Sequence, residues 1–177
     1  MKFEKLDIEG AYLITIEPYR DDRGTFERRF CKKEFENAGI DFNVCQSNLS
    51  KNLKKGTIRG MHWQREPYAE GKLVSCQKGA IYDVIADVRR NSPTYLKWFG
   101  VELTEDNDKM LYIPPYVAHG YQTLVDNTTV FYQVSEFFYP DYYGVMRYND
   151  PAFGIEWRDI KPVIINKKDK NYEDWKV

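Results

Sequence analysis

The spacing of short strand signals, roughly ten residues apart, most constrains what this chain can fold into. Runs rich in β-branched and aromatic residues alternate with turn sequences such as Lys78-Gly79 and Asn91-Ser92-Pro93. The expected strands are Ala11–Ile16, Thr57–Gln64, Lys72–Gln77, Ala80–Val88, Lys97–Thr104, Met110–Ile113 and Thr128–Ser135. Short strands at this spacing are typical of antiparallel sandwiches and barrels. We therefore predict an all-β fold, a jelly-roll β-barrel.

Helix signals are few. The clearest covers Lys32–Ala38, where Gly39 can end a short surface helix. A length of 177 residues suits a single domain, residues 1–177. The tail from about residue 140 to 177 contains Pro and Trp in an irregular pattern, and we expect it to wrap the barrel.

Composition excludes several classes of protein. Aromatic residues make up 16% of the chain, which argues against disorder, and a net charge of -1 leaves no basic stripe for nucleic acid. No apolar run approaches the ~20 residues of a membrane helix, and the first residues lack the apolar stretch of a signal peptide. Three cysteines without metal-ligand spacing suggest reduced thiols in a cytoplasmic protein.

The strand expected at Ala80–Val88 carries acidic residues on one of its faces. Alternation places Ile81, Asp83, Ile85 and Asp87 together on that face. The pattern fits two arrangements equally, one in which the face lines a barrel cavity and one in which it meets solvent.

The chain has only two histidines, His62 and His119, and both stand in or beside expected strands. The sequence has no HxH, no HxxxH and no cysteine pair, so it lacks the usual ligand spacing of a metal site. We therefore expect no metal. An imidazole that binds no metal is suited to proton transfer, because it titrates near ~6.5.

Other residues are suited to assist a proton transfer. A carbanion beside a carbonyl needs a cation or hydrogen-bond donor on its oxygen, and Lys72 begins the strand after His62. Tyr132 lies mid-strand and can deliver a proton to a bound molecule, although its sequence context also fits core packing. Arg23 and Arg59 stand beside glycines, a setting that suits phosphate binding but also surface ion pairs.

Longer motifs run in order over nearly the whole chain. They include Asp22-Arg23-Gly24-x-Phe26, Gln46-x-Asn48-x-Ser50, Gly56 to Gln64, Gly71-Lys72-Leu73-Val74, Ala118-His119-Gly120, Tyr132, Asn149-Asp150-Pro151 and Lys168-Asp169. Together these motifs resemble, with high specificity, one known family, the dTDP-4-dehydrorhamnose 3,5-epimerases of nucleotide-sugar metabolism. The resemblance implies a cupin-like jelly-roll barrel that acts as a homodimer without metal or cofactor.

The resemblance also implies roles for individual residues. His62 matches the base that removes the proton next to the C4 ketone, and Asp169 matches the carboxylate paired with it. Lys72 matches the cation near the enolate oxygen, and Tyr132 the acid that returns a proton on the opposite face. Asp83 is expected to support Lys72 or His62. The implied nucleotide and substrate contacts are Arg23, Phe26, Gln46, Asn48, Arg59, His119, Phe138 and Lys168.

These roles together predict an epimerase of a nucleotide-linked 4-keto-6-deoxyhexose. The expected reaction takes dTDP-4-dehydro-6-deoxyglucose to dTDP-4-dehydrorhamnose. Pathway logic adds a dehydratase that makes the keto sugar and a reductase that traps the product. Rhamnose for a surface polysaccharide is the final product implied by the resemblance.

The sequence departs from the family pattern at three positions. Arg28 stands where the family usually has Glu, Phe138 replaces a Tyr that stacks on the base, and Tyr143 lies where a Glu is common. These changes keep open an alternative substrate with another nucleotide, and epimerisation at C3 or C5 alone or an isomerisation is equally compatible with the catalytic residues. A non-catalytic sugar-binding module and a metal-dependent cupin enzyme are the competing function classes.

Overall fold

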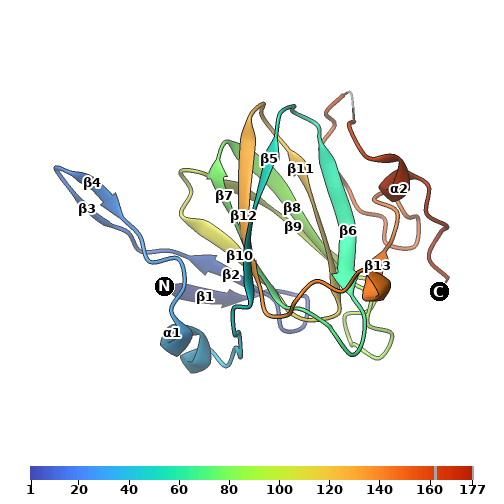
Figure 1. The fold of residues 1–177 in the computed structure, drawn as a ribbon, viewed down its shortest axis with the longest axis horizontal. Coiled ribbons are helices and arrows are strands. Elements are labelled where there is room, and N and C mark those ends of the chain that lie inside the picture. Colours follow the sequence, from blue (N-terminus) through green and yellow to red (C-terminus); the bar gives the residue numbers. More distant parts are fainter. Residues whose placement is uncertain (162, 177) are drawn as a thin grey trace.

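The computed structural model describes residues 1–161 and 163–176, and most strands in this part of the chain form two antiparallel sheets (Figure 1). The larger sheet has the order β1 (Lys2–Lys5), β2 (Tyr12–Thr15), β10 (Lys109–Ile113), β7 (Lys72–Lys78), β12 (Thr128–Val134) and β5 (Gln46–Asn52). The smaller sheet has the order β13 (Tyr143–Val145), β6 (Ile58–Gln64), β11 (Val117–Thr123), β8 (Ala80–Asp87) and β9 (Trp98–Thr104). The predicted all-β, cupin-like jelly-roll barrel is confirmed.

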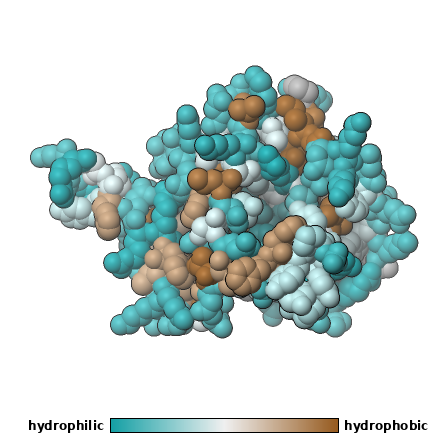
Figure 2. Space-filling view, viewed as in Figure 1, coloured by the Kyte–Doolittle hydropathy of each residue, from teal (hydrophilic) through white to brown (hydrophobic). Residues whose placement is uncertain are grey.

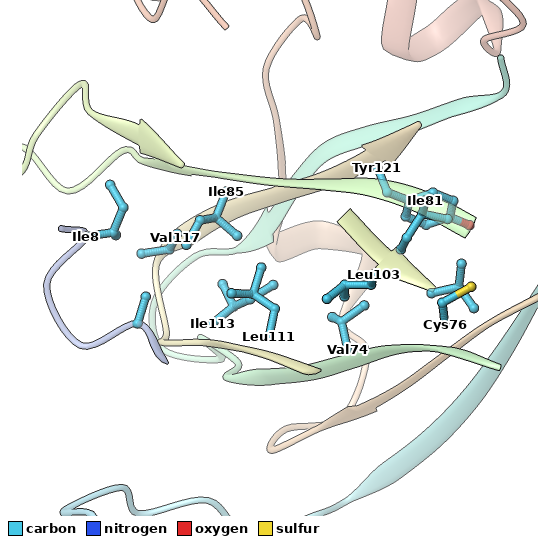
Figure 3. Packing of buried hydrophobic residues seen from close by; sticks show 12 residues of the cluster. Ile8, Val74, Cys76, Ile81, Ile85, Leu103, Leu111, Ile113, Val117 and Tyr121 are labelled. Atoms are coloured by element: carbon cyan, nitrogen blue, oxygen red, sulfur yellow. The ribbon is translucent and has the colours of Figure 1, made fainter. Parts of the chain in front are cut away.

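The core lies between the two sheets. Figure 3 shows Val74, Leu111 and Ile113 of the larger sheet facing Ile81, Ile85 and Leu103 of the smaller one. Each of these side chains is at most 3% exposed, and burying one contributes about 1.5–3 kcal/mol. Aliphatic side chains therefore fill the space between the two sheets in this part of the barrel.

Strand β8 resolves the choice that its sequence leaves open. Asp83 and Asp87 are fully buried together with Ile81 and Ile85, so this face points into the barrel and not to solvent. The opposite face is covered as well, because Val84 and the other residues there pack against Met146, Phe153 and Ile155 from the C-terminal tail. A strand buried on both faces holds its side chains firmly, which suits it to position a polar group.

The predicted surface helix is present as α1 (Lys32–Asn37). Phe35 is its buried residue, and its ring packs edge-on against Phe3 of β1 at 5.2 Å. Gly39 follows with a φ of 78°, a left-handed conformation that ends the helix. The second helix, α2 (Lys167–Lys170), is a single turn, and neither helix of the described chain is long and apolar enough to cross a membrane.

A two-stranded arm projects from the body of the molecule. It consists of β3 (Tyr19–Asp21) and β4 (Gly24–Phe26), and it extends well beyond the barrel in Figures 1 and 2. Tyr19 is 63% exposed and Phe26 is 72% exposed. The arm thus holds two aromatic side chains in solvent.

Candidate active site

A cavity of about 870 Å³ opens between the sheets, on the side of β5, β6 and β12. Side chains from both sheets and from α2 line it. Most of the predicted site residues are among them: Gln46, Asn48, Arg59, His62, Lys72, His119, Tyr132, Phe138 and Asp169. His62 and Asp169, which lie 107 positions apart in the sequence, therefore meet at one space.

A bulge in β6 sets the position of the first histidine. His62 lies opposite His119 of β11, while Arg59 lies opposite Tyr121, so β6 has one residue more than β11 between these two pairs. Gly60 provides the bulge with a φ of 133°. A Cβ atom at this position would lie 2.9 Å from the His119 carbonyl oxygen, so only glycine fits. The bulge allows both histidines to reach the same cavity.

His62 forms a dyad with a buried carboxylate. Its Nε2 lies 2.9 Å from Oδ1 of Asp169, whose side chain is only 6% exposed. Asn166 fixes this carboxylate in turn, because its Nδ2 donates to Asp169 Oδ2 at 3.1 Å while its Oδ1 accepts from the Asp169 backbone N–H at 2.9 Å. A carboxylate held in this way fixes the orientation of the imidazole.

Lys72 and Tyr132 stand on the other wall, in β7 and β12 of the larger sheet. Burial lowers the pKa of Lys72, and the neighbouring carboxylate of Glu70, which accepts a hydrogen bond from Lys72 Nζ, opposes that shift. Burial also raises the pKa of Tyr132, with a further rise from Glu70 and an opposing effect of Arg59. A phenol of raised pKa stays protonated at neutral pH and can act as an acid.

The second histidine has a carboxylate partner of its own. Nε2 of His119 lies 2.7 Å from Oδ1 of Asp83, and burial raises the pKa of that carboxyl while His119 opposes the rise. We expected Asp83 to support Lys72 or His62. Its hydrogen bond goes to His119 because β8 pairs with β11, which makes the two side chains diagonal neighbours on one face.

Two contacts shape the polar end of the cavity. Arg59 donates from Nε to Oδ1 of Asn52 at 2.8 Å, which leaves the rest of its guanidinium for a ligand. The backbone N–H of Phe138 donates to Oε1 of Gln46 at 3.1 Å and so fixes this aromatic residue at the rim.

Three of the predicted nucleotide contacts lie away from the cavity lining. Arg23 and Phe26 belong to the arm, where Arg23 is 87% exposed at its side chain and pairs with Asp21 at 2.6 Å. Lys168 lies beside Asn171 in a separate shallow hollow over α2. The fold of one chain thus gathers the expected catalytic residues but not all of the expected nucleotide contacts.

Among the cavity residues that were not predicted as site residues, Tyr143 and Glu70 lie beside the expected catalytic groups. The ring of Tyr143 lies 4.9 Å from the imidazole of His62, and burial together with the charges of Asp169 and Glu70 raises its pKa. Glu70 stands two residues before Lys72 in the sequence, so alternation places it on the same side, and this signal was available. Within residues 1–161 and 163–176, no group of three or more His, Cys, Asp or Glu side chains converges on a possible metal position.

Comparison of the chain with known proteins identifies its family. The model of the dTDP-4-dehydrorhamnose 3,5-epimerase family matches residues 5–176. The chain belongs to this family. A curated member from Sinorhizobium fredii is 38% identical to it over 171 residues, which cover 97% of this chain and 88% of the relative.

Solved structures of the family share its fold. The crystal structure of dTDP-4-dehydrorhamnose 3,5-epimerase from Bacillus anthracis, with TDP and PPi bound, is 37% identical with a TM-score of 0.93, and the match covers 98% of this chain and 99% of that one. ChmJ from Streptomyces bikiniensis, a 3'-monoepimerase solved with dTDP-quinovose, is 30% identical with a TM-score of 0.87, and covers 93% and 83%. The family therefore includes enzymes named for two centres and an enzyme named for one.

Proposed function

We propose that this protein epimerises a nucleotide-linked 4-keto-6-deoxyhexose, converting dTDP-4-dehydro-6-deoxyglucose to dTDP-4-dehydrorhamnose. One observation carries the proposal. The His62–Asp169 dyad stands on the wall formed by the smaller sheet, and Tyr132 with Lys72 stands on the wall formed by the larger sheet. Inverting a stereocentre requires a base and an acid on opposite faces of the sugar ring, and two walls of one cavity supply them.

The reaction proceeds through an enolate. The C4 ketone acidifies the neighbouring C–H bonds, and His62 removes one of these protons while Asp169 holds its imidazole. The ammonium group of Lys72 stabilises the negative oxygen that develops at C4. Tyr132 then delivers a proton to the opposite face of the ring, so the carbon is inverted without any change in oxidation state. We propose that no metal or cofactor takes part.

The remainder of the cavity suits the nucleotide diphosphate. Its volume of about 870 Å³ lies in the range of sites for ligands of this size. Arg59 and His119 are placed to bind phosphate oxygens, Gln46 and Asn48 offer amide groups, and the ring of Phe138, 55% exposed at the rim, can stack on a base.

A homodimer completes this site in our proposal. Arg23 and Phe26 have expected nucleotide contacts yet stand on an arm outside their own cavity. A second copy of the chain can receive the arm at its own cavity, which would add a guanidinium and an aromatic ring to the nucleotide end. Lys168 is proposed to contact the diphosphate from α2, after a movement of its long side chain.

The other members of the reaction sequence follow from the chemistry. A dehydratase must produce the 4-keto sugar, and a reductase must consume the epimerised ketone. We place the reaction in the cytoplasm, where nucleotide sugars are made and where the free thiols of Cys31, Cys45 and Cys76 stay reduced.

An alternative function is epimerisation of a single centre, C3 or C5, or isomerisation, of a differently activated keto sugar. The similarity to a 3'-monoepimerase favours epimerisation of a single centre. The departures from the family pattern at Arg28, Phe138 and Tyr143 favour a sugar attached to another nucleotide. Binding of dTDP, CDP, UDP and GDP by calorimetry separates the nucleotides, because tightest binding of any but dTDP contradicts the main proposal.

Solvent deuterium exchange tests the reaction itself. The protein is mixed with dTDP-4-keto-6-deoxyglucose in deuterium oxide, and the sugar is followed by NMR. Deuterium at both C3 and C5 is the expected result, and deuterium at one centre supports the single-centre alternative. If neither C3 nor C5 exchanges its proton for deuterium, the proposal for this substrate is overturned. A parallel sample with a chelator tests the proposed independence from metal, since unchanged exchange is expected.

A further inference from the structure

Glu70 is a buried acid in the cavity for which the reaction described above has no role. Its Oε1 accepts a hydrogen bond from Nζ of Lys72, and both side chains are only 9% exposed. Both residues line the same cavity as His62 and Tyr132. The other carboxylate in the lining, Asp169, is already bonded to His62.

A buried ammonium group needs a counter-charge to remain an ammonium group. Moving Lys72 out of water favours its neutral amine, and a neutral amine lacks the full positive charge that stabilises an enolate best. An adjacent carboxylate opposes this preference, and Glu70 is the group that raises the pKa of Lys72 against the larger effect of burial. Without that carboxylate, Lys72 loses its proton at a lower pH.

The same carboxylate acts on the proton donor. A negative charge disfavours the phenolate, and Glu70 raises the pKa of Tyr132 beyond the rise that burial causes. The remaining charged or titratable groups of the lining are Arg59 and His62 from β6, His119 and Tyr121 from β11, Tyr143 from β13, and Asp169 from α2. Of these, Arg59 opposes Glu70 at Tyr132, and both histidines are paired with carboxylates of their own.

We propose that Glu70 is a positioning residue that keeps Lys72 positively charged and Tyr132 protonated, and thereby extends enolate chemistry to higher pH. This inference deepens the proposed function and rests on it for the identity of the reaction. It also implies a cost, because Glu70 partly neutralises the cation that faces the enolate. At low pH, where Lys72 is protonated in any case, removing Glu70 leaves the rate equal or increases it.

The pH dependence of kcat tests the proposal. Activity needs the protonated forms of Lys72 and Tyr132, so it falls as the pH rises through the lower of their two pKa values. Glu70→Gln, which keeps size and a hydrogen-bond acceptor, is expected to move this alkaline limb about 1–3 pH units lower. Glu70→Asp is the matched control, since it keeps the charge and is expected to retain the limb near its wild-type position.

The two variants together distinguish a charge effect from a structural one. A uniform fall of kcat at every pH, with the limb unmoved in Glu70→Gln, would overturn the proposal. Glu70→Met replaces the acid by an apolar side chain of similar length. This variant is also expected to move the alkaline limb to lower pH, and it is used if Glu70→Gln does not fold.

A second measurement needs no substrate. Lysine labelled with ¹³C at Cε reports its own titration by NMR, and the resonance of Lys72 is identified by its absence in Lys72→Met. Lys72 is expected to titrate at lower pH in Glu70→Gln than in wild type, and an unchanged titration would refute the proposal. If this shift occurs but wild type turns over no 4-keto sugar, the proposed function fails while the coupling of Glu70 to Lys72 stands.

Discussion

The cavity and the arm both carry residues expected to bind the nucleotide, but they hold them in opposite ways. At the cavity, His119, an expected nucleotide contact, is held by a hydrogen bond with the buried carboxylate of Asp83, as His62 is held by Asp169. On the arm, Arg23 pairs with Asp21 two residues away, and Phe26 is 72% exposed. One chain thus fixes its proposed catalytic groups by itself, whereas in our proposal the arm residues act only against a second copy of the chain. A sequence motif does not distinguish these two cases.

The largest expected effect comes from the base in the cavity. His62→Ala removes the proton acceptor and is expected to lower turnover at least about 1,000-fold, with an unchanged thermal melt and unchanged dTDP binding. Turnover, circular dichroism and calorimetry check the three quantities. His119→Ala provides the contrast, because it should weaken nucleotide binding yet still allow exchange of the alpha proton with solvent. Unfolding of His62→Ala would instead make this histidine structural.

Two glycines, one in the barrel and one in the arm, extend the contrast between these regions to the free energy of unfolding. Gly60 in the barrel wall and Gly24 in the arm both have positive φ angles, 133° and 122°. A Cβ atom at Gly60 meets the backbone of β11, whereas at Gly24 nothing lies within 4 Å. Gly60→Ala is therefore expected to lower the free energy of unfolding by about 3–5 kcal/mol and Gly24→Ala by about 1–2 kcal/mol. Urea denaturation measures both, and equal losses would contradict the contrast.

The smallest expected effect is that of the arm on affinity. Arg23→Ala should weaken dTDP binding about 10-fold through loss of a charge-assisted hydrogen bond, with kcat within about 2-fold of wild type and an unchanged melt. Lys32→Ala, which removes an exposed cation of α1 outside the arm, is the matched control and should leave affinity unchanged. Wild-type affinity in Arg23→Ala would exclude the arm from the nucleotide site.

Much of the barrel was predictable, and two of the strands that escaped prediction, β5 and β11, did so for different reasons. Alternation or a continuous apolar run marked β6, β7, β8 and β12, and each was found close to its expected bounds. Strand β5, with the sequence QSNLSKN, points polar residues into a polar cavity, so it lacks the expected apolar face. Strand β11 is buried on both faces and contains Gly120, so it shows no alternation.

The candidate active site was likewise predictable only in part. The resemblance to the family placed His62, Lys72, Tyr132 and Asp169 in one set, and the fold brings them to one cavity. Pairing between side chains was less accessible, because the bond of Asp83 to His119 depends on which strands are neighbours. Tyr143 escaped prediction because 14 tyrosines occur in the chain and none stands out by type alone.

The dyad also has a consequence for the order in which the enzyme becomes active. His62 and Asp169 are separated by 107 residues. A ribosome that adds roughly 5–20 residues per second takes about 5–20 s to synthesise that stretch. Throughout this interval the emerging polypeptide contains His62 without the carboxylate that orients its imidazole. Under the proposed mechanism, catalysis begins only after translation has passed Asp169, and chains released before that point are inactive.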